Sequence, residues 1–225
     1  MNQRPIRIAV MVSGQGRGSN MRAIADACKS GKINGELALV VGVDDCAPAM
    51  ENARGCGVKT MAIAPGDYPG TGRYDEAVLA ALLENRIDLI CLAGYMRVLG
   101  RKTVETFRNR IMNVHPALIP SFCGKGMYGH HVHEAVIARG VKVTCVTVHL
   151  VDEDYDTGPI ILQRVVAVEP DDTPDVLAAR LLPVEHQTYT DAIALFSHDR
   201  LTVEDRRVRI SPCTDREQLC HLDGD

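Results

Sequence analysis

Short apolar runs rich in β-branched residues alternate with longer segments of helical periodicity through the first half of the chain. This alternation is typical of a parallel sheet covered by helices. We therefore predict an α/β fold with an open, mostly parallel sheet and helices on both of its faces. The predicted strands are Ile6–Val12, Leu37–Val43, Lys59–Ile63, Ile87–Ala93 and Ile111–Val114, and the predicted helices are Ser19–Lys29, Pro48–Arg54 and Arg73–Glu84.

The pattern changes beyond Pro120, where a glycine-rich loop, residues 121–129, precedes a predicted helix at Val132–Arg139. Two longer strand-like runs follow, Lys142–Val151 and Pro159–Val168. Because only a short acidic loop joins them, we expect them to be antiparallel neighbours. The carboxyl-terminal part of the sheet is thus predicted to be antiparallel.

The last predicted helix has a readable start, because Thr173 can cap it and Pro174 suits its first position. We expect it to reach Ser197, with a kink near Pro183, which lacks a backbone donor. Residues 200–210 alternate like a small hairpin. Residues 1–210 are therefore predicted to form a single domain with halves at about 6–115 and 116–210, followed by a loose polar tail, residues 211–225.

Composition narrows the class of protein. The 225 residues are 46% hydrophobic, which excludes a disordered or fibrous chain. The net charge is −4 and like charges do not cluster, so we expect no nucleic-acid partner. No apolar stretch approaches the roughly 20 residues of a membrane span, and no signal peptide is evident. We expect a cytoplasmic protein without a membrane partner, present as a monomer or a homodimer.

Two groups of residues could supply metal ligands. The eight cysteines include no CxxC pair, and only Cys213 and Cys220 in the polar tail are spaced like a metal clip. His130 and His133 would share one face of a helix while His131 would point elsewhere, and no third ligand is evident. We therefore expect no bound metal.

A glycine loop, residues 13–20, joins the first strand to the first helix at the carboxyl edge of the predicted sheet, where open α/β folds bind ligands. Its spacing is GxGxG, which does not favour a dinucleotide dehydrogenase. The free amides of Gly18, Ser19 and Asn20 at the helix start suit a phosphate. The alternative is a tight turn in which Ser19 only caps the helix.

Three polar residues suggest acyl transfer to an amine. Asn113 and His115 lie two residues apart on one strand and share a face, and Asp156 lies in the acidic loop between the two later strands. Asn113 can donate to an oxyanion, His115 can supply positive charge or a proton, and Asp156 can accept the proton of the amine. Each residue alone also fits an ordinary structural role.

Four ordered motifs make the chain recognisable: GSN at 18–20, LAGYMRVL at 92–99, NVHPALIP at 113–120 and DEDYDTGPII at 152–161. Together they resemble the glycinamide ribonucleotide formyltransferase family, over about residues 6–210. The resemblance implies a Rossmann-like formyltransferase fold and transfer of a formyl group from 10-formyltetrahydrofolate to glycinamide ribonucleotide in purine biosynthesis.

The resemblance also implies roles for individual residues. Asn113, His115 and Asp156 would be catalytic, and Glu185 would meet the glycinamide end of a ribonucleotide whose phosphate lies on Gly18, Ser19 and Asn20. The implied folate-binding residues are Met96, Arg97, Val98, Leu99, Asp152 and Asp156.

Departures from the family pattern concern the phosphate loop, which has two extra residues, and the glycine-rich segment 121–129. The alternatives are another folate-dependent formyltransferase or a hydrolase of the same fold, both of which would carry a further domain for which we expect no room here. A non-catalytic module that binds a phosphorylated ribose is the remaining alternative, and it would not need the three polar residues.

Overall fold

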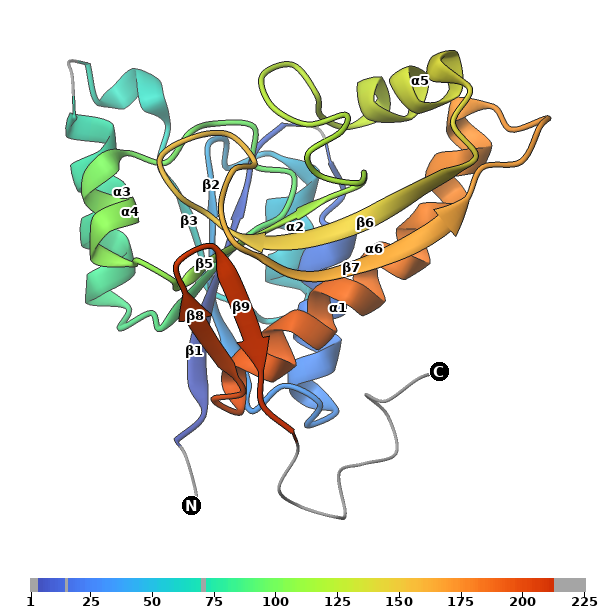
Figure 1. The fold of residues 1–225 in the computed structure, drawn as a ribbon. Coiled ribbons are helices and arrows are strands. Elements are labelled where there is room, and N and C mark those ends of the chain that lie inside the picture. Colours follow the sequence, from blue (N-terminus) through green and yellow to red (C-terminus); the bar gives the residue numbers. More distant parts are fainter. Residues whose placement is uncertain (1–3, 15, 70–71, 213–225) are drawn as a thin grey trace.

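The computed structural model describes residues 4–14, 16–69 and 72–212 and contains one nine-stranded sheet. The strand order is β3-β2-β1-β4-β5-β6-β7-β9-β8, and Figure 1 shows β6 and β7 running side by side next to α6. Strands β1 to β5 are mutually parallel, whereas β6 is antiparallel to both β5 and β7. The predicted fold class is therefore confirmed, including the antiparallel carboxyl-terminal part.

The elements match the predicted ones within two residues at each end wherever one was predicted. In chain order the structure has β1 Ile6–Val12, α1 Ser19–Lys29, β2 Gly35–Gly42, α2 Pro48–Gly55, β3 Thr60–Ala62, η1 Pro65–Asp67, α3 Arg73–Glu84, β4 Leu89–Leu92, α4 Arg101–Thr106, β5 Ile111–His115, α5 His130–Arg139, β6 Val143–Leu150, β7 Ile160–Ala167, α6 Pro174–Ser197, β8 Leu201–Glu204 and β9 Arg207–Ile210.

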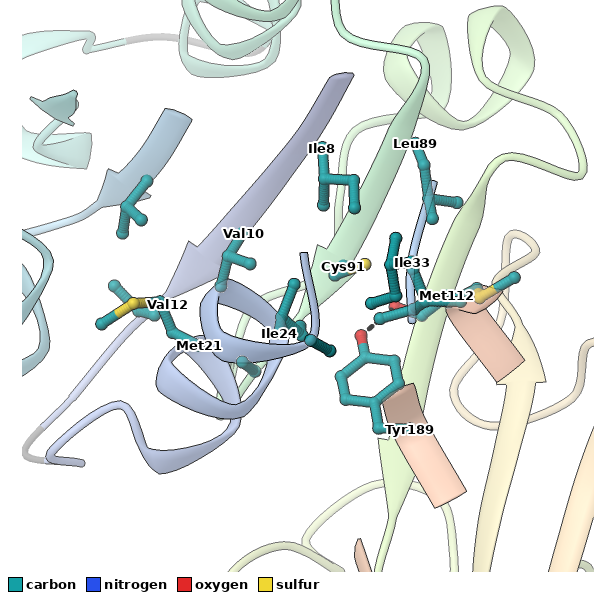
Figure 2. Close-up of a cluster of buried hydrophobic side chains, with 14 of the residues drawn as sticks. Ile8, Val10, Val12, Met21, Ile24, Ile33, Leu89, Cys91, Met112 and Tyr189 are labelled. Carbon is teal, nitrogen blue, oxygen red and sulfur yellow. Dashed lines mark hydrogen bonds between the residues drawn. The ribbon is translucent and has the colours of Figure 1, made fainter. Parts of the chain in front are cut away.

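The alternation of side chains along β1 divides the core into two layers. Ile8, Val10 and Val12 face α1, α2 and α6, whereas Ala9 and Met11 face α3 and α4. Because helices cover both faces, each of these five side chains is almost completely buried. Figure 2 shows the first layer, in which Met21 and Ile24 of α1 lie against β1.

Tyr189 of α6 ties the last helix to the centre of the sheet. Its side chain is fully buried, and its hydroxyl lies 3.0 Å from the carbonyl oxygen of Leu92 and 2.9 Å from that of Met112. These carbonyls belong to β4 and β5, and Figure 2 shows the ring beside Cys91 and Met112. Tyr189 therefore fixes α6 beneath the two strands whose ends carry the polar site residues.

Helix α6 begins as predicted, because the amide of Val176 donates to the Thr173 hydroxyl at 3.3 Å. The helix runs through Pro183 as one element to Ser197, and the kink stays a prediction. The predicted hairpin is confirmed, since β8 and β9 pair antiparallel. Most of the predicted tail, with Cys213 and Cys220, lies outside the described residues.

Two short elements were not predicted from the pattern. Helix α4 has six residues and only Thr103 and Val104 are buried, so it lacks a readable apolar periodicity. The 3₁₀ helix η1 is a single turn after Ala64. Across the described segments of the chain, no helix has the length and apolar character needed to cross a bilayer.

Candidate active site

A cleft of about 300 Å³ opens at the carboxyl ends of β4 and β5. Its walls come from the turn after β4, the end of β5, the glycine-rich segment 121–129 and the acidic loop 152–156. Ligands of open α/β sheets bind at this edge of the strands. All three predicted catalytic residues, Asn113, His115 and Asp156, line this cleft.

Asp156 lies between the other two residues of the trio. Its Oδ1 accepts a hydrogen bond from Asn113 Nδ2 at 3.4 Å, and its Oδ2 lies 3.9 Å from His115 Nδ1. The amide of Gly124 also donates to Asp156 Oδ2, at 2.9 Å. The carboxylate therefore joins β5 to the acidic loop and to the glycine-rich segment.

His149 belongs to the same group. It pairs with Asn113 across β5 and β6, and its Nε2 lies 3.3 Å from Asn113 Nδ2 and 3.5 Å from Asp156 Oδ1. Its Nδ1 lies 2.8 Å from the carbonyl oxygen of Leu150, which can only accept. Nδ1 must therefore carry hydrogen, and in the neutral ring Nε2 accepts from Asn113. The only signal in the sequence was the period-two alternation of its strand.

The ring of His115 is also oriented by a hydrogen bond to a backbone carbonyl, here through Nε2 and not through Nδ1. Its Nε2 lies 2.8 Å from the carbonyl oxygen of Phe122, so Nε2 carries hydrogen and Nδ1 faces Asp156. Burial lowers the pKa of His115, although the nearby carboxylate of Asp156 opposes this effect. The ring is consequently neutral at pH 7 in the absence of a further negative charge.

Asp156 is ionised despite its partial burial. Burial alone would raise its pKa, but contact with the His149 ring, the hydrogen bond from the Gly124 amide and the proximity of the His115 ring outweigh that effect. The resulting pKa lies below the ordinary value of an aspartate. An ionised carboxylate next to two imidazoles can receive a proton from a reacting group.

Tight backbone geometry places Asp156 in the cleft. Its φ of 54° lies in the left-handed region, which aspartate tolerates better than most residues. Gly158 is required two residues later, because a Cβ there would lie 1.8 Å from the carbonyl oxygen of Leu150. The hydroxyl of Thr157 donates to Asp152 Oδ1 at 2.6 Å and closes the loop on itself.

The predicted phosphate site lies at the start of α1. Gly18 precedes the helix with a φ of 74°, and a Cβ there would come within 3.1 Å of the Ala49 side chain. The N-cap position belongs to Gly18, which has no side chain, and Ser19 is the first helical residue instead of the cap. The amides of the first helical turn therefore keep their donors free of intrahelical bonds.

Glu185 connects this helix start to the cleft. It lines the cleft, and its Oε1 accepts a hydrogen bond of 2.5 Å from Asn20 Nδ2. Burial raises the pKa of Glu185, and the bond from Asn20 counteracts that rise. The side chain of Asn20 thus has a role that the sequence did not indicate, as the partner of a buried carboxyl group.

Most of the predicted folate-binding residues line the cleft. Met96, Arg97, Val98 and Asp152 do so, and the side chains of Met96 and Val98 are about half exposed. Leu99 is different, because it is 5% exposed and packs in the core layer under α3 and α4. The structure does not bring Leu99 to the cleft wall.

The histidine cluster does not form a metal centre. His130 and His131 both lie near Glu134, at 3.6 and 3.2 Å, on an exposed face, whereas His133 is buried and lines the cleft. Among the residues that the structure describes, no three histidine, cysteine or acidic side chains are arranged to hold a metal ion.

The whole arrangement is that of a class of proteins that transfers a one-carbon acyl group. A sequence profile described as formyl transferase matches residues 6–193. The chain belongs to the formyl transferase family. The curated relatives include the chloroplastic phosphoribosylglycinamide formyltransferase of Arabidopsis thaliana, 38% identical over 197 residues that cover 87% of this chain and 66% of the relative. The phosphoribosylglycinamide formyltransferase of Bacillus subtilis is 34% identical and is covered to 92%, against 83% of this chain.

The solved structures agree with this assignment. Glycinamide ribonucleotide transformylase 1 from Symbiobacterium toebii has a TM-score of 0.86 and 41% identity, covering 93% of this chain and 95% of its own. A formyltetrahydrofolate deformylase from Pseudomonas syringae has a TM-score of 0.81 at 21% identity and shows the same fold. The chain spans 66% of the length of the Arabidopsis thaliana relative and 62% of the corresponding chloroplastic enzyme of Vigna unguiculata. It spans 18% of the human trifunctional purine biosynthetic protein.

Proposed function

We propose that this protein transfers the formyl group of 10-formyltetrahydrofolate to the amino group of glycinamide ribonucleotide, a step of de novo purine biosynthesis. One observation carries the proposal: Asn113, His115 and Asp156 converge in one cleft of a formyl transferase fold. The names of the relatives that match over most of this chain support the choice of substrates.

The proposed reaction begins with attack of the substrate amine on the formyl carbon. The π electrons of the carbonyl move to its oxygen, and the resulting oxyanion accepts a hydrogen bond from Asn113 Nδ2. The developing negative charge favours the protonated form of His115, whose Nδ1 faces the cleft beside Asp156. The ring gains its positive charge when Asp156 passes on to Nδ1 the proton that the attacking amine loses.

Proton transfer completes the proposed cycle. Asp156 receives the proton that the attacking amine loses, because its carboxylate stays ionised at neutral pH. When the intermediate collapses, the bond between the formyl carbon and the folate nitrogen breaks and that nitrogen takes up a proton. His115 and Asp156 are the two groups placed to supply it. The chemistry requires no enzyme nucleophile, since the amine attacks directly.

The two substrates are proposed to enter from opposite sides of the trio. The phosphate of the ribonucleotide would lie on the amides of Gly18, Ser19 and Asn20, in the positive field of the helix terminus, with Glu185 near the amine. The folate would lie against Met96, Arg97 and Val98, with Asp152 and Asp156 on the facing loop. Exposed apolar side chains in a cleft suit a flat heterocycle.

The net charge is −4 and like charges do not cluster, so we propose neither a nucleic acid nor a membrane surface as a partner. Hydrolysis of the same folate is the reaction that would result if water replaced the amine. A single assay separates the two reactions.

The protein should be incubated with 10-formyltetrahydrofolate in the presence and absence of glycinamide ribonucleotide, while absorbance reports the released tetrahydrofolate. We expect release only with both substrates and formation of the formylated ribonucleotide in equal amount. Equal release without the ribonucleotide would indicate a hydrolase, and no release under either condition would refute the proposed function.

A further inference from the structure

Ser13, the first residue after β1, contacts the turn that follows β4 through three hydrogen bonds. Its backbone amide donates to the carbonyl oxygen of Gly94 at 3.3 Å, and its hydroxyl lies 3.3 Å from the same oxygen. The amide of Met96 donates to the Ser13 hydroxyl oxygen at 2.6 Å. The Ser13 hydroxyl therefore accepts from the amide of Met96 at one end of the turn and can donate to the carbonyl of Gly94 at the other end.

The turn that Ser13 holds forms a wall of the cleft. Gly94, Met96, Arg97 and Val98 all line it, whereas Ser13 does not. Gly94 has a φ of 67°, so the chain reverses direction at a residue that tolerates the left-handed region.

The far side of the turn is anchored to α3. The hydroxyl of Tyr95 lies 3.0 Å from that of Tyr74, and the guanidinium of Arg97 lies 5.2 Å from the centre of the Tyr74 ring. Tyr95 is 9% exposed, whereas the side chains of Met96 and Val98 are about half exposed. Within the described structure, both side-chain hydrogen bonds that reach the backbone of residues 94–98 involve the Ser13 hydroxyl.

We infer that Ser13 is a positioning residue that sets the place of the folate-binding turn relative to the phosphate loop. Ser13 begins the glycine loop whose far end, Gly18 to Asn20, opens helix α1, but its hydroxyl contacts the turn after β4 and not that far end. Without the hydroxyl, the amide of Met96 loses its acceptor and the wall of residues 96–98 is free to shift. This inference rests on the proposed function, because it assigns the turn to the folate.

The test compares steady-state constants of wild-type protein, Ser13→Ala, Ser13→Cys and Ser13→Thr, with Ser30→Ala as the matched control. Ser30 also donates from its hydroxyl to a carbonyl, that of Ala27 at 3.1 Å, but it caps the far end of α1. Loss of one hydrogen bond corresponds to a change of about three- to tenfold in a binding constant.

We expect Ser13→Ala and Ser13→Cys to raise KM for 10-formyltetrahydrofolate about three- to tenfold, with less than twofold change in KM for the ribonucleotide. Ser13→Thr keeps the hydroxyl and should restore the folate KM to within twofold of wild type, and Ser30→Ala should leave both constants unchanged. A merely structural role would not separate the two KM values.

Wild-type folate KM in both Ser13→Ala and Ser13→Cys, or an equal rise in both KM values, would overturn the inference while leaving the proposed function intact. A wild-type protein without turnover and without measurable binding of tetrahydrofolate would overturn the proposed function, and the inference with it.

Discussion

Asn113 carries no charge, so its side chain can assist the reaction only through its amide hydrogens and its carbonyl oxygen. Nδ2 lies within 3.5 Å of both Asp156 Oδ1 and His149 Nε2, which orients the amide toward the cleft. The orientation is set before substrate arrives, and a preorganised donor of this kind acts mainly on the transition state.

Asn113→Ala should therefore lower kcat about 100- to 1,000-fold while changing KM for the ribonucleotide less than about twofold. Steady-state kinetics with both substrates check this expectation. A kcat near the wild-type value would remove Asn113 from the mechanism.

Asp156→Asn tests the proton acceptor at almost constant shape. The variant can still accept the hydrogen bond from Gly124, but its amide cannot take a proton from the amine, so we expect kcat to fall by about 100-fold or more. Asp171→Asn, an exposed carboxylate that does not line the cleft, is the matched control. Full activity in Asp156→Asn would contradict the assigned role, as would an equal loss in the control.

At the scale of elements, α6 is held to the sheet by a buried polar contact as well as by packing. The Tyr189 hydroxyl lies close to carbonyl oxygens of both β4 and β5, and Glu185, one turn earlier on α6, reaches Asn20 at the start of α1. Helix α6 therefore links the strand ends with the phosphate site.

Tyr189→Phe should lower the free energy of unfolding by about 1 to 2 kcal/mol, because it removes a buried donor and leaves two carbonyls without it. Chemical denaturation measures the change. Tyr68→Phe is the matched control, since that ring is half-buried and its hydroxyl makes no hydrogen bond within the described part of the chain. Equal stability of Tyr189→Phe and wild-type protein would show that packing alone holds α6.

The elements that sequence patterns predicted best are those with readable ends. Helix α6 begins at Pro174, directly after Thr173, as expected, and α1 and α3 match residue for residue. Helix α4 escaped prediction because its six residues are mostly polar and exposed. Local sequence patterns therefore predicted most of the helices and strands. They failed where an element is too short to show a hydrophobic period.

The sequence was enough to predict most of the residues that form the site, but not all of the contacts between them. The motifs indicated Asn113, His115 and Asp156, whereas the part of His149 depends on the register between β5 and β6, which the sequence does not display. Leu99 was expected in the folate wall and instead packs in the core, because the turn directs only Met96, Arg97 and Val98 outward. Contacts between distant segments, such as Asn20 with Glu185, need the tertiary structure.

At the scale of the whole molecule, three buried or half-buried histidines link stability to pH. His115, His133 and His186 all have pKa values lowered by burial, so the folded state binds protons less readily than the unfolded chain. The stability they provide is complete above their unfolded pKa of about 6.5 and is lost as the pH falls toward their folded values.

We therefore expect the midpoint of thermal unfolding to be lower at pH 5.5 than at pH 7.5. Replacing His133, which is buried with an unpartnered Nδ1, by Asn should reduce this difference. Differential scanning calorimetry across the range checks both statements. A midpoint that rises on acidification would contradict the assignment of these histidines as buried and neutral.

The parallel and antiparallel parts of the sheet meet at the trio, since Asn113 and His115 lie on β5 and Asp156 lies in the loop that follows the antiparallel strand β6. The position of a bound formyl group relative to these side chains is therefore the decisive quantity. A crystal structure with glycinamide ribonucleotide and a non-transferring analogue of 10-formyltetrahydrofolate measures it directly. We predict that the analogue's carbonyl oxygen lies within hydrogen-bond distance of Asn113 Nδ2, with the amine on the Asp156 side. A carbonyl bound away from Asn113, His115 and Asp156 would contradict the account.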